Sequence, residues 1–193
     1  MNYINVMLVE DDPIWMDCIK EYLEKHNDIK IVHCAKGYKE AIEAFKEQKV
    51  SVALIDVMLT PNCCDGFKAA CELKKLGLNN IIMLTDLDDK DIVLEAFDNG
   101  AINYIKKSLY TDLPNAIRAA QLKQVSIHPD ICHILISELK KERKLRYVLT
   151  PIERQVYDLR EKGMNRNEIA KALFKSEETV KKQIKQIQVK INS

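Results

Sequence analysis

The feature that most constrains the fold is a regular alternation of short apolar runs and amphipathic stretches through the first two thirds of the chain. The apolar runs are rich in β-branched and large residues, with little strict apolar–polar alternation, which is typical of strands buried on both faces. The stretches between them repeat apolar residues at helical spacing. The pattern predicts strands over 4–9, 29–35, 50–55, 81–84 and 102–105, and helices over 13–26, 38–48, 66–76, 89–99 and 112–124.

Five strand–helix pairs predict an α/β domain of the flavodoxin-like, doubly wound type, a five-stranded parallel sheet in the order 2-1-3-4-5. The remaining residues read as short helices and predict a small all-α helix-turn-helix domain. Thr150 caps a helix that begins at Pro151, and Glu153 completes a capping box. Asn167 and Ser176 are further candidate caps. The expected organisation is residues 1–124, a linker with a helix over 125–146, and residues 147–193.

Charge is distributed unevenly between these parts. Residues 1–144 hold 23 Asp and Glu against 19 Lys and Arg, whereas residues 145–193 hold 6 against 11. An acidic front and a basic tail indicate two modules, the second facing a polyanion. The N-terminus has no basic region before an apolar core, and the longest apolar run is interrupted by Asp56. We therefore expect a cytoplasmic protein with no membrane partner and with free thiols at its six cysteines.

Polar side chains follow four of the five expected strands, at the point where each of these strands ends. Glu10 and Asp11 follow the first strand, Asp56 the third and Thr85 the fourth, and Lys107 lies just beyond the fifth. The carboxyl ends of parallel strands share one edge of the sheet, so these groups should converge. Acids so close repel one another, and Mg²⁺ relieves that repulsion. A carboxylate beside the metal could then attack a phosphoryl group whose charge the lysine and the hydroxyl neutralise.

The segments "VMLVEDDP", "VALIDVMLT", "IIMLTD" and "GAINYIKKS" resemble, in order and spacing, the receiver domain of two-component response regulators over about residues 3–124. The resemblance implies that Asp56 accepts phosphate from a histidine kinase. It implies that Mg²⁺ is held by Glu10, Asp11, Asp56 and the backbone carbonyl of Met58.

The same resemblance implies that Thr85 binds phosphoryl oxygens and switches together with Tyr104, and that Lys107 is the family lysine. One departure concerns the loop after Asp56. The family usually has proline four residues and glycine eight residues after the phosphoacceptor, whereas here Pro61 and Gly66 stand at plus five and plus ten. The loop is therefore expected to be about two residues longer.

The basic tail ends in an amphipathic helix with an apolar stripe formed by Val180, Ile184, Ile187 and Ile191. Away from that stripe lie the candidate DNA-binding residues Lys181, Lys182, Lys185 and Gln186. Lysine can read guanine and glutamine can read adenine in the major groove. Further cations expected at phosphates are Arg166, Lys171, Lys175 and Lys190.

The segments "LTPIERQV", "NEIAKAL" and "TVKKQI" resemble the LuxR/NarL-type DNA-binding domain over about residues 148–192. The resemblance makes Lys181, Lys182 and Lys185 the base readers. Phe174 occupies a turn position where the family often has glycine, and Gln183 one where histidine is common. Many members continue past the position of Ser193 into a dimerising helix, so the homodimer expected on activation would form through the receiver or the helix over 127–145.

These features predict a two-domain transcriptional response regulator, not an enzyme, in which phosphorylation of Asp56 shifts a two-state receiver. Binding of two half-sites on duplex DNA at once then raises affinity. Two alternatives stay open. One is a regulator of the same architecture that senses another signal, such as oxidation of Cys63 and Cys64. The other is a Mg²⁺-dependent phosphohydrolase with Asp56 as its nucleophile.

Overall fold

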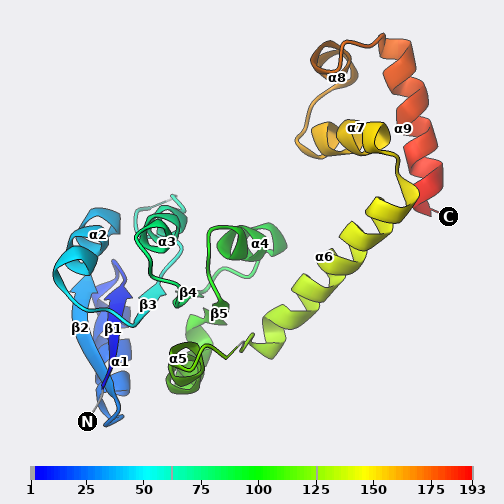
Figure 1. The fold of residues 1–193 in the computed structure, drawn as a ribbon. Coiled ribbons are helices and arrows are strands. Elements are labelled where there is room, and N and C mark those ends of the chain that lie inside the picture. The colour runs from blue at the N-terminus through cyan, green and yellow to red at the C-terminus, as the bar shows by residue number, and fades with distance from the viewer. Residues whose placement is uncertain (1–2, 62, 125, 193) are drawn as a thin grey trace. The chain divides into compact units, whose positions relative to one another are not determined.

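The computed structural model of the protein describes residues 3–61, 63–124 and 126–192 (Figure 1). Residue 62 of the expected long loop and residue 125 at the expected start of the linker lie outside these ranges. The chain divides into two compact units, Met1–Ile134 and Leu135–Ser193, and each is described by itself.

The first unit is built on a five-stranded sheet in the order β2-β1-β3-β4-β5. Every neighbouring pair of strands is parallel, and Leu54 of the central strand pairs with Leu8 on one side and Ile82 on the other. The predicted fold class and strand order are therefore confirmed. The strands are β1 (Ile4–Val9), β2 (Ile29–Ala35), β3 (Val52–Ile55), β4 (Ile81–Thr85) and β5 (Asn103–Lys106).

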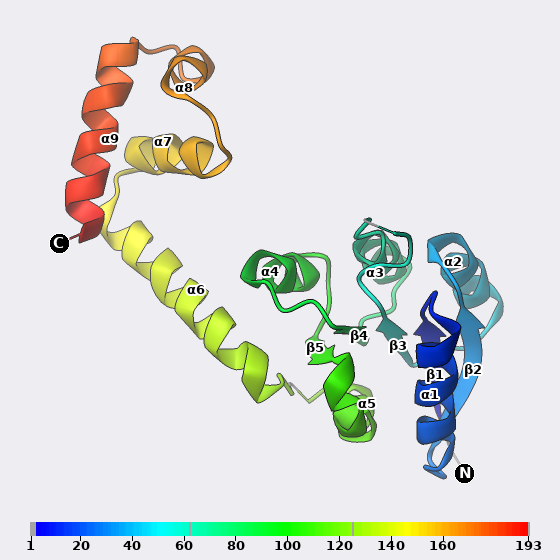
Figure 2. The same ribbon diagram turned by 180° about the vertical axis from the view of Figure 1, so that it is seen from behind.

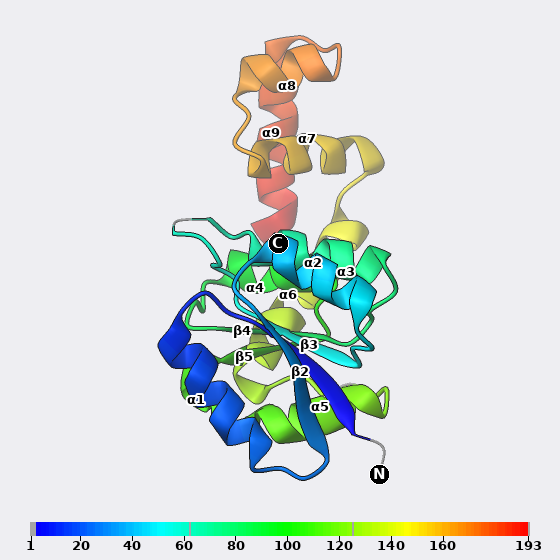
Figure 3. The same cartoon turned by 90° about the vertical axis from the view of Figure 1, so that its left-hand side faces the viewer.

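Helices cover both faces of this sheet (Figure 3). The face that carries Leu8, Leu54 and Leu84 packs against α1 and α5 through residues such as Ile19 and Ile117. The other face is covered by α2, α3 and α4. Burial from two sides explains why the strand sequences are continuously apolar. The helices are α1 (Pro13–Glu24), α2 (Tyr38–Glu47), α3 (Gly66–Lys75), α4 (Lys90–Asp98) and α5 (Leu113–Gln121), and the short 3₁₀ helix η1 (Lys107–Asp112) precedes α5.

A long helix, α6 (Pro129–Val148), begins in the first unit and continues into the second. The second unit adds α7 (Pro151–Glu161), α8 (Arg166–Ala172) and α9 (Glu177–Asn192), as Figure 2 shows. One small core joins the four helices, and it contains Leu145, Val156, Ile169, Val180 and Ile187.

Side-chain caps set the helix starts in the second unit. The capping box between Thr150 and Glu153 is present as predicted. The α8 helix is capped by Asn165, not by the predicted Asn167, because the Asn165 side chain accepts from two backbone N–H groups. Phe174 adopts a left-handed φ of +53° in the turn before α9, and its side chain is 97% exposed. The turn therefore tolerates phenylalanine by directing the ring into solvent.

Glu153 also ties the beginning of α7 to the end of α9. Its buried carboxylate accepts from the Thr150 backbone N–H at 2.8 Å and from Lys190 Nζ at 2.8 Å. These hydrogen bonds, the one from Lys190 first, lower the pKa of Glu153. A depressed carboxyl pKa stabilises the fold above the unfolded pKa of about 4.3, and this stabilisation is lost as the pH falls below that value.

Glu153→Ala is expected to destabilise the second unit by about 1–2 kcal/mol, since it removes a cap and leaves Lys190 without this carboxylate. Urea unfolding can be followed by far-UV circular dichroism and by the fluorescence of Trp15, the only tryptophan, which lies in the first unit. The dichroism transition should move and the Trp15 transition should not. Glu178→Ala, at an exposed site on α9, is the matched control. Equal effects of the two changes would contradict the assignment.

Candidate functional site: an acidic pocket and a basic helix

Three carboxylates and one lysine of the first unit meet where β1, β3 and β5 end. Glu10 directly follows β1, Asp56 directly follows β3, and Lys107 directly follows β5. The Asp56 backbone N–H donates to Val9 O at 2.9 Å, which fixes the two strand ends side by side. The sheet topology therefore brings together residues that are far apart in the sequence.

Three carboxylates could hold a cation at this edge of the sheet. Glu10, Asp11 and Asp56 each offer an oxygen, and these oxygens all lie within 4.8 Å of one another. Glu10 and Asp56 are buried, whereas Asp11 is exposed and leaves the group open to solvent. Oxygen ligands that keep an open side suit Mg²⁺, which retains several of its waters. The donor set fits the predicted metal.

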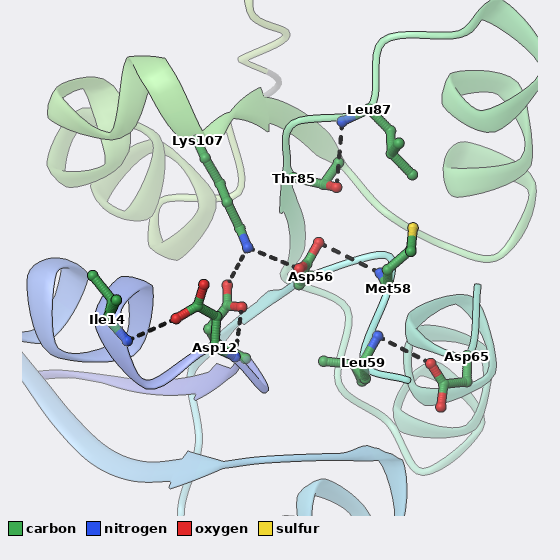
Figure 4. Close-up of polar contacts among 10 residues, drawn as sticks. Asp12, Ile14, Asp56, Met58, Leu59, Asp65, Thr85, Leu87 and Lys107 are labelled. Atoms are coloured by element: carbon green, nitrogen blue, oxygen red, sulfur yellow. Dashed lines mark hydrogen bonds and ion pairs between the residues drawn. The ribbon is translucent and has the colours of Figure 1, made fainter. Parts of the chain in front are cut away.

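Lys107 lies inside the same cluster. Its Nζ atom is 2.7 Å from Glu10 Oε2 and 2.8 Å from Asp56 Oδ2, as Figure 4 shows for Asp56. Burial acts to lower the pKa of Lys107, but the hydrogen bonds that its ammonium donates to the two carboxylates outweigh burial, and the pKa of Lys107 is raised. Burial raises the pKa of Glu10 to about 7. The raised pKa favours the charged ammonium of Lys107 beside the candidate phosphoacceptor.

Thr85 and Tyr104 both contact Leu87 in the loop after β4. The Leu87 backbone N–H donates to Thr85 Oγ1 at 3.5 Å, and the Tyr104 hydroxyl donates to Leu87 O at 2.6 Å. Tyr104 is fully buried, and this burial raises its pKa. Neighbouring Lys106 pairs with Asp88 at 2.9 Å instead of reaching the pocket. The Thr85 hydroxyl and the hydroxyl of the buried Tyr104 are therefore both hydrogen-bonded to the backbone of Leu87.

The loop between β3 and α3 contains Asp56 and folds back against its carboxylate. The Met58 backbone N–H lies 3.5 Å from Asp56 Oδ1 (Figure 4). Further along, Asp65 accepts hydrogen bonds from this loop, and Gly66 begins α3. Sequence reasoning assigned no role to Asp65. Its only signal was its position just before a glycine at the start of a helix.

The candidate DNA-binding residues share one exposed surface of α9. The four residues are exposed to solvent, and they are Lys181, Lys182, Lys185 and Gln186. Val180 and Ile187 of the apolar stripe are buried. A hollow beside them is lined by Arg160 and Arg166 together with Lys181 and Lys185. Arg160 was not among the predicted cations. Lys190 was, but here it donates to buried Glu153.

In the part of the chain that the structure describes, no helix is long and apolar enough to cross a membrane.

A parallel sheet with a carboxylate cluster and a buried lysine at its carboxyl edge, joined to a helix-turn-helix unit, defines the class of response regulators. Comparison with known proteins agrees. Residues 6–118 match the response regulator receiver domain, and residues 147–193 match the family described as bacterial regulatory proteins, luxR family. The chain belongs to the response regulators with a receiver domain and a LuxR-type DNA-binding domain, which is the organisation of two-component transcription regulators. The predicted resemblance is therefore confirmed.

Relatives match over nearly the whole chain. The response regulator protein VraR of Staphylococcus epidermidis is 30% identical over 190 residues, which cover 97% of this chain and 90% of VraR. VraR of Staphylococcus aureus matches to the same extent, at 30%, 97% and 90%. Among solved structures, the RcsB–DNA complex has a TM-score of 0.66 at 25% identity, covering 98% of this chain and 92% of that one. RcsB of Salmonella typhimurium has a TM-score of 0.63 at 26% identity, covering 100% and 93%.

Proposed function

We propose that this response regulator is switched by transfer of a phosphoryl group from a histidine kinase to Asp56. The observation that carries the proposal is the placement of Lys107 Nζ within 2.8 Å of Asp56 and 2.7 Å of Glu10, beside the cluster of three carboxylates. An aspartate oxygen can form a bond to phosphorus only if the charge on the other phosphoryl oxygens is neutralised. The Lys107 ammonium is buried and in contact with the Asp56 carboxylate, where it can neutralise this charge.

Glu10, Asp11 and Asp56 would hold Mg²⁺ together with the Met58 carbonyl, and the bound ion would neutralise phosphoryl oxygens. Asp56 supplies the nucleophilic carboxylate oxygen, and Lys107 and Thr85 bind the oxygens of the transferred group. Because Thr85 and Tyr104 both contact Leu87, a shift of Thr85 toward a phosphoryl group would disturb the hydrogen bond of Tyr104. This is the proposed switch.

The second unit would bind duplex DNA through the exposed surface of α9. In the proposed organisation, residues 1–124 form the receiver domain, residues 125–146 a linker with a helix, and residues 147–193 the DNA-binding domain. RcsB dimers bound to DNA are among the similar solved structures. By analogy, phosphorylation would favour a homodimer that reads two half-sites at once, in the cytoplasm.

Treatment with acetyl phosphate and Mg²⁺ tests the proposal. We expect the intact protein to gain the mass of one phosphoryl group and the labelled protein to bind duplex DNA more tightly than the unlabelled protein does. The DNA is a duplex selected from a random-sequence library. Labelling without any change in DNA affinity would contradict the proposed coupling.

The alternative input, oxidation of Cys63 and Cys64, has weaker support. Cys64 is exposed, but desolvation of its thiol and the nearby Glu95 carboxylate raise the pKa of that thiol, which disfavours the reactive thiolate. Mass spectrometry after peroxide treatment, set beside acetyl phosphate treatment, separates the two inputs. No observation favours the phosphohydrolase alternative.

Lys182→Ala is expected to weaken duplex binding about 5- to 150-fold, as for the loss of one base-reading side chain worth about 1–3 kcal/mol. Fluorescence anisotropy at several salt concentrations measures this loss. Lys140→Ala removes the same charge from an exposed position on α6 and is the control. Equal losses of DNA affinity in the two variants would show that only net charge matters and that Lys182 does not read a base.

A further inference from the structure

The Asp65 side chain ties together the two ends of the loop between β3 and α3. Its Oδ1 atom accepts from the Leu59 backbone N–H at 3.1 Å, and its Oδ2 atom accepts from Thr60 Oγ1 at 2.6 Å. A turn in the same loop is held by the Cys63 N–H, which donates to Thr60 O at 3.0 Å. The end of the loop is therefore tied back to its beginning by both oxygens of a single carboxylate.

Asp65 stands where a helix cap is expected but does not act as one. It directly precedes α3, a position where aspartate commonly accepts hydrogen bonds from the first N–H groups of the helix. Here its side chain makes no such bond. The carboxylate faces back across the loop toward Leu59, as Figure 4 shows. Its hydrogen bonds therefore serve the loop rather than the helix.

Peptide geometry links this contact to the candidate metal site. The Leu59 N–H and the Met58 carbonyl belong to one planar trans peptide, so they point in opposite directions. The Met58 N–H faces the Asp56 carboxylate at 3.5 Å. In Figure 4, Asp65 lies on the other side of the loop from Asp56. Holding the Leu59 N–H toward Asp65 therefore turns the Met58 carbonyl toward the side where Asp56 lies.

We propose that Asp65 is a positioning residue for the magnesium site: by binding the Leu59 N–H, its carboxylate aims the Met58 carbonyl at the acidic pocket. The inference rests on the proposed function, because it takes Glu10, Asp11 and Asp56 as the other ligands. It also gives a physical reason why the longer loop of this chain still serves the site. Two additional residues increase the conformational freedom of a loop. The Asp65 carboxylate restricts that freedom at the peptide between Met58 and Leu59.

The test compares Asp65→Ala with Asp65→Asn by Mg²⁺ titration in a calorimeter without any phosphodonor. Asp65→Ala removes the acceptor, and we expect the Kd for Mg²⁺ to rise about 10-fold, as for a lost outer-shell contact to a metal ligand. Asp65→Asn removes the same charge but keeps an oxygen for the Leu59 N–H, so its Kd should stay near that of the wild type. Thr60→Ala leaves the Leu59 contact in place and should also stay near the wild type.

The dependence of the labelling rate on Mg²⁺ concentration provides a second readout. The rate of labelling by acetyl phosphate at saturating Mg²⁺ should be unchanged in Asp65→Ala, while the Mg²⁺ concentration for half-maximal rate rises. Wild-type affinity in Asp65→Ala would overturn the proposal, and so would an equal loss in Asp65→Asn, which would indicate a pure charge effect. Failure of the wild type to bind Mg²⁺ or to be labelled would instead overturn the proposed function, and this inference with it.

Discussion

Asp56→Asn is expected to lose phosphoryl labelling by acetyl phosphate and Mg²⁺ completely. An amide oxygen is a poor nucleophile and carries no charge for a cation, whereas the Asp56 carboxylate lies 2.8 Å from Lys107 and shares the 4.8 Å cluster with Glu10 and Asp11. Intact-protein mass spectrometry measures the label. The DNA affinity of this variant should no longer respond to acetyl phosphate.

Metal binding provides a second measurement on the same variant. A ligand that binds only the folded state stabilises it by about 2.7 kcal/mol at a concentration a hundred times its Kd. Mg²⁺ should therefore raise the melting temperature of the wild type much more than that of Asp56→Asn. Asp86→Asn, the same change at an exposed site next to Thr85, is the matched control and should behave as the wild type does. Full labelling of Asp56→Asn would place the acceptor on another residue.

The sheet could be predicted from sequence because burial on two faces leaves a local pattern. The strand that contains Leu54, Val52–Ile55, is apolar at every position, and a central parallel strand needs that composition. The order of the strands then placed the residues that follow them at one edge, so Glu10, Asp56 and Lys107 could be expected together. The strand ends were less accurate. The third strand begins at Val52 rather than at residue 50, since propensity does not define the last hydrogen bond of a ladder.

What sequence could not reveal are contacts between distant residues without a periodic signature. Lys190 looks like any exposed cation of a basic helix, yet it donates to Glu153, 37 residues away. Asn165 and Asn167 are equally good caps on paper, and the backbone path alone decides that Asn165 acts. Sequence reasoning assigned no role to Asp65, and only the structure shows that its carboxylate turns toward Leu59. Each of these roles depends on the direction of a side chain, which spacing does not encode.

Gly66→Ala is expected to damage the acidic pocket through the backbone. A Cβ atom on Gly66 would lie 1.9 Å from the carbonyl oxygen of Asp56 and 2.9 Å from the Cα of Val57. The Gly66 N–H also donates to Val57 O at 3.0 Å, so α3 begins in direct contact with the segment that carries Asp56, the proposed phosphoacceptor. Because the obstructing atoms belong to the backbone, no side-chain rotation can relieve the clash.

Relief then requires α3 to move away from β3 or the Asp56 peptide to turn. Either movement costs about 1–3 kcal/mol of stability, as overpacking does elsewhere, and displaces Asp56 from Lys107. We therefore expect a lower urea midpoint by Trp15 fluorescence together with slower labelling by acetyl phosphate. Gly37→Ala is the matched control. Gly37 also stands at a helix start, directly before α2, but its backbone is extended and no atom lies within 4 Å of an added Cβ. If Gly66→Ala were as stable and as quickly labelled as Gly37→Ala, the close approach of α3 to the proposed phosphoacceptor would not constrain the site.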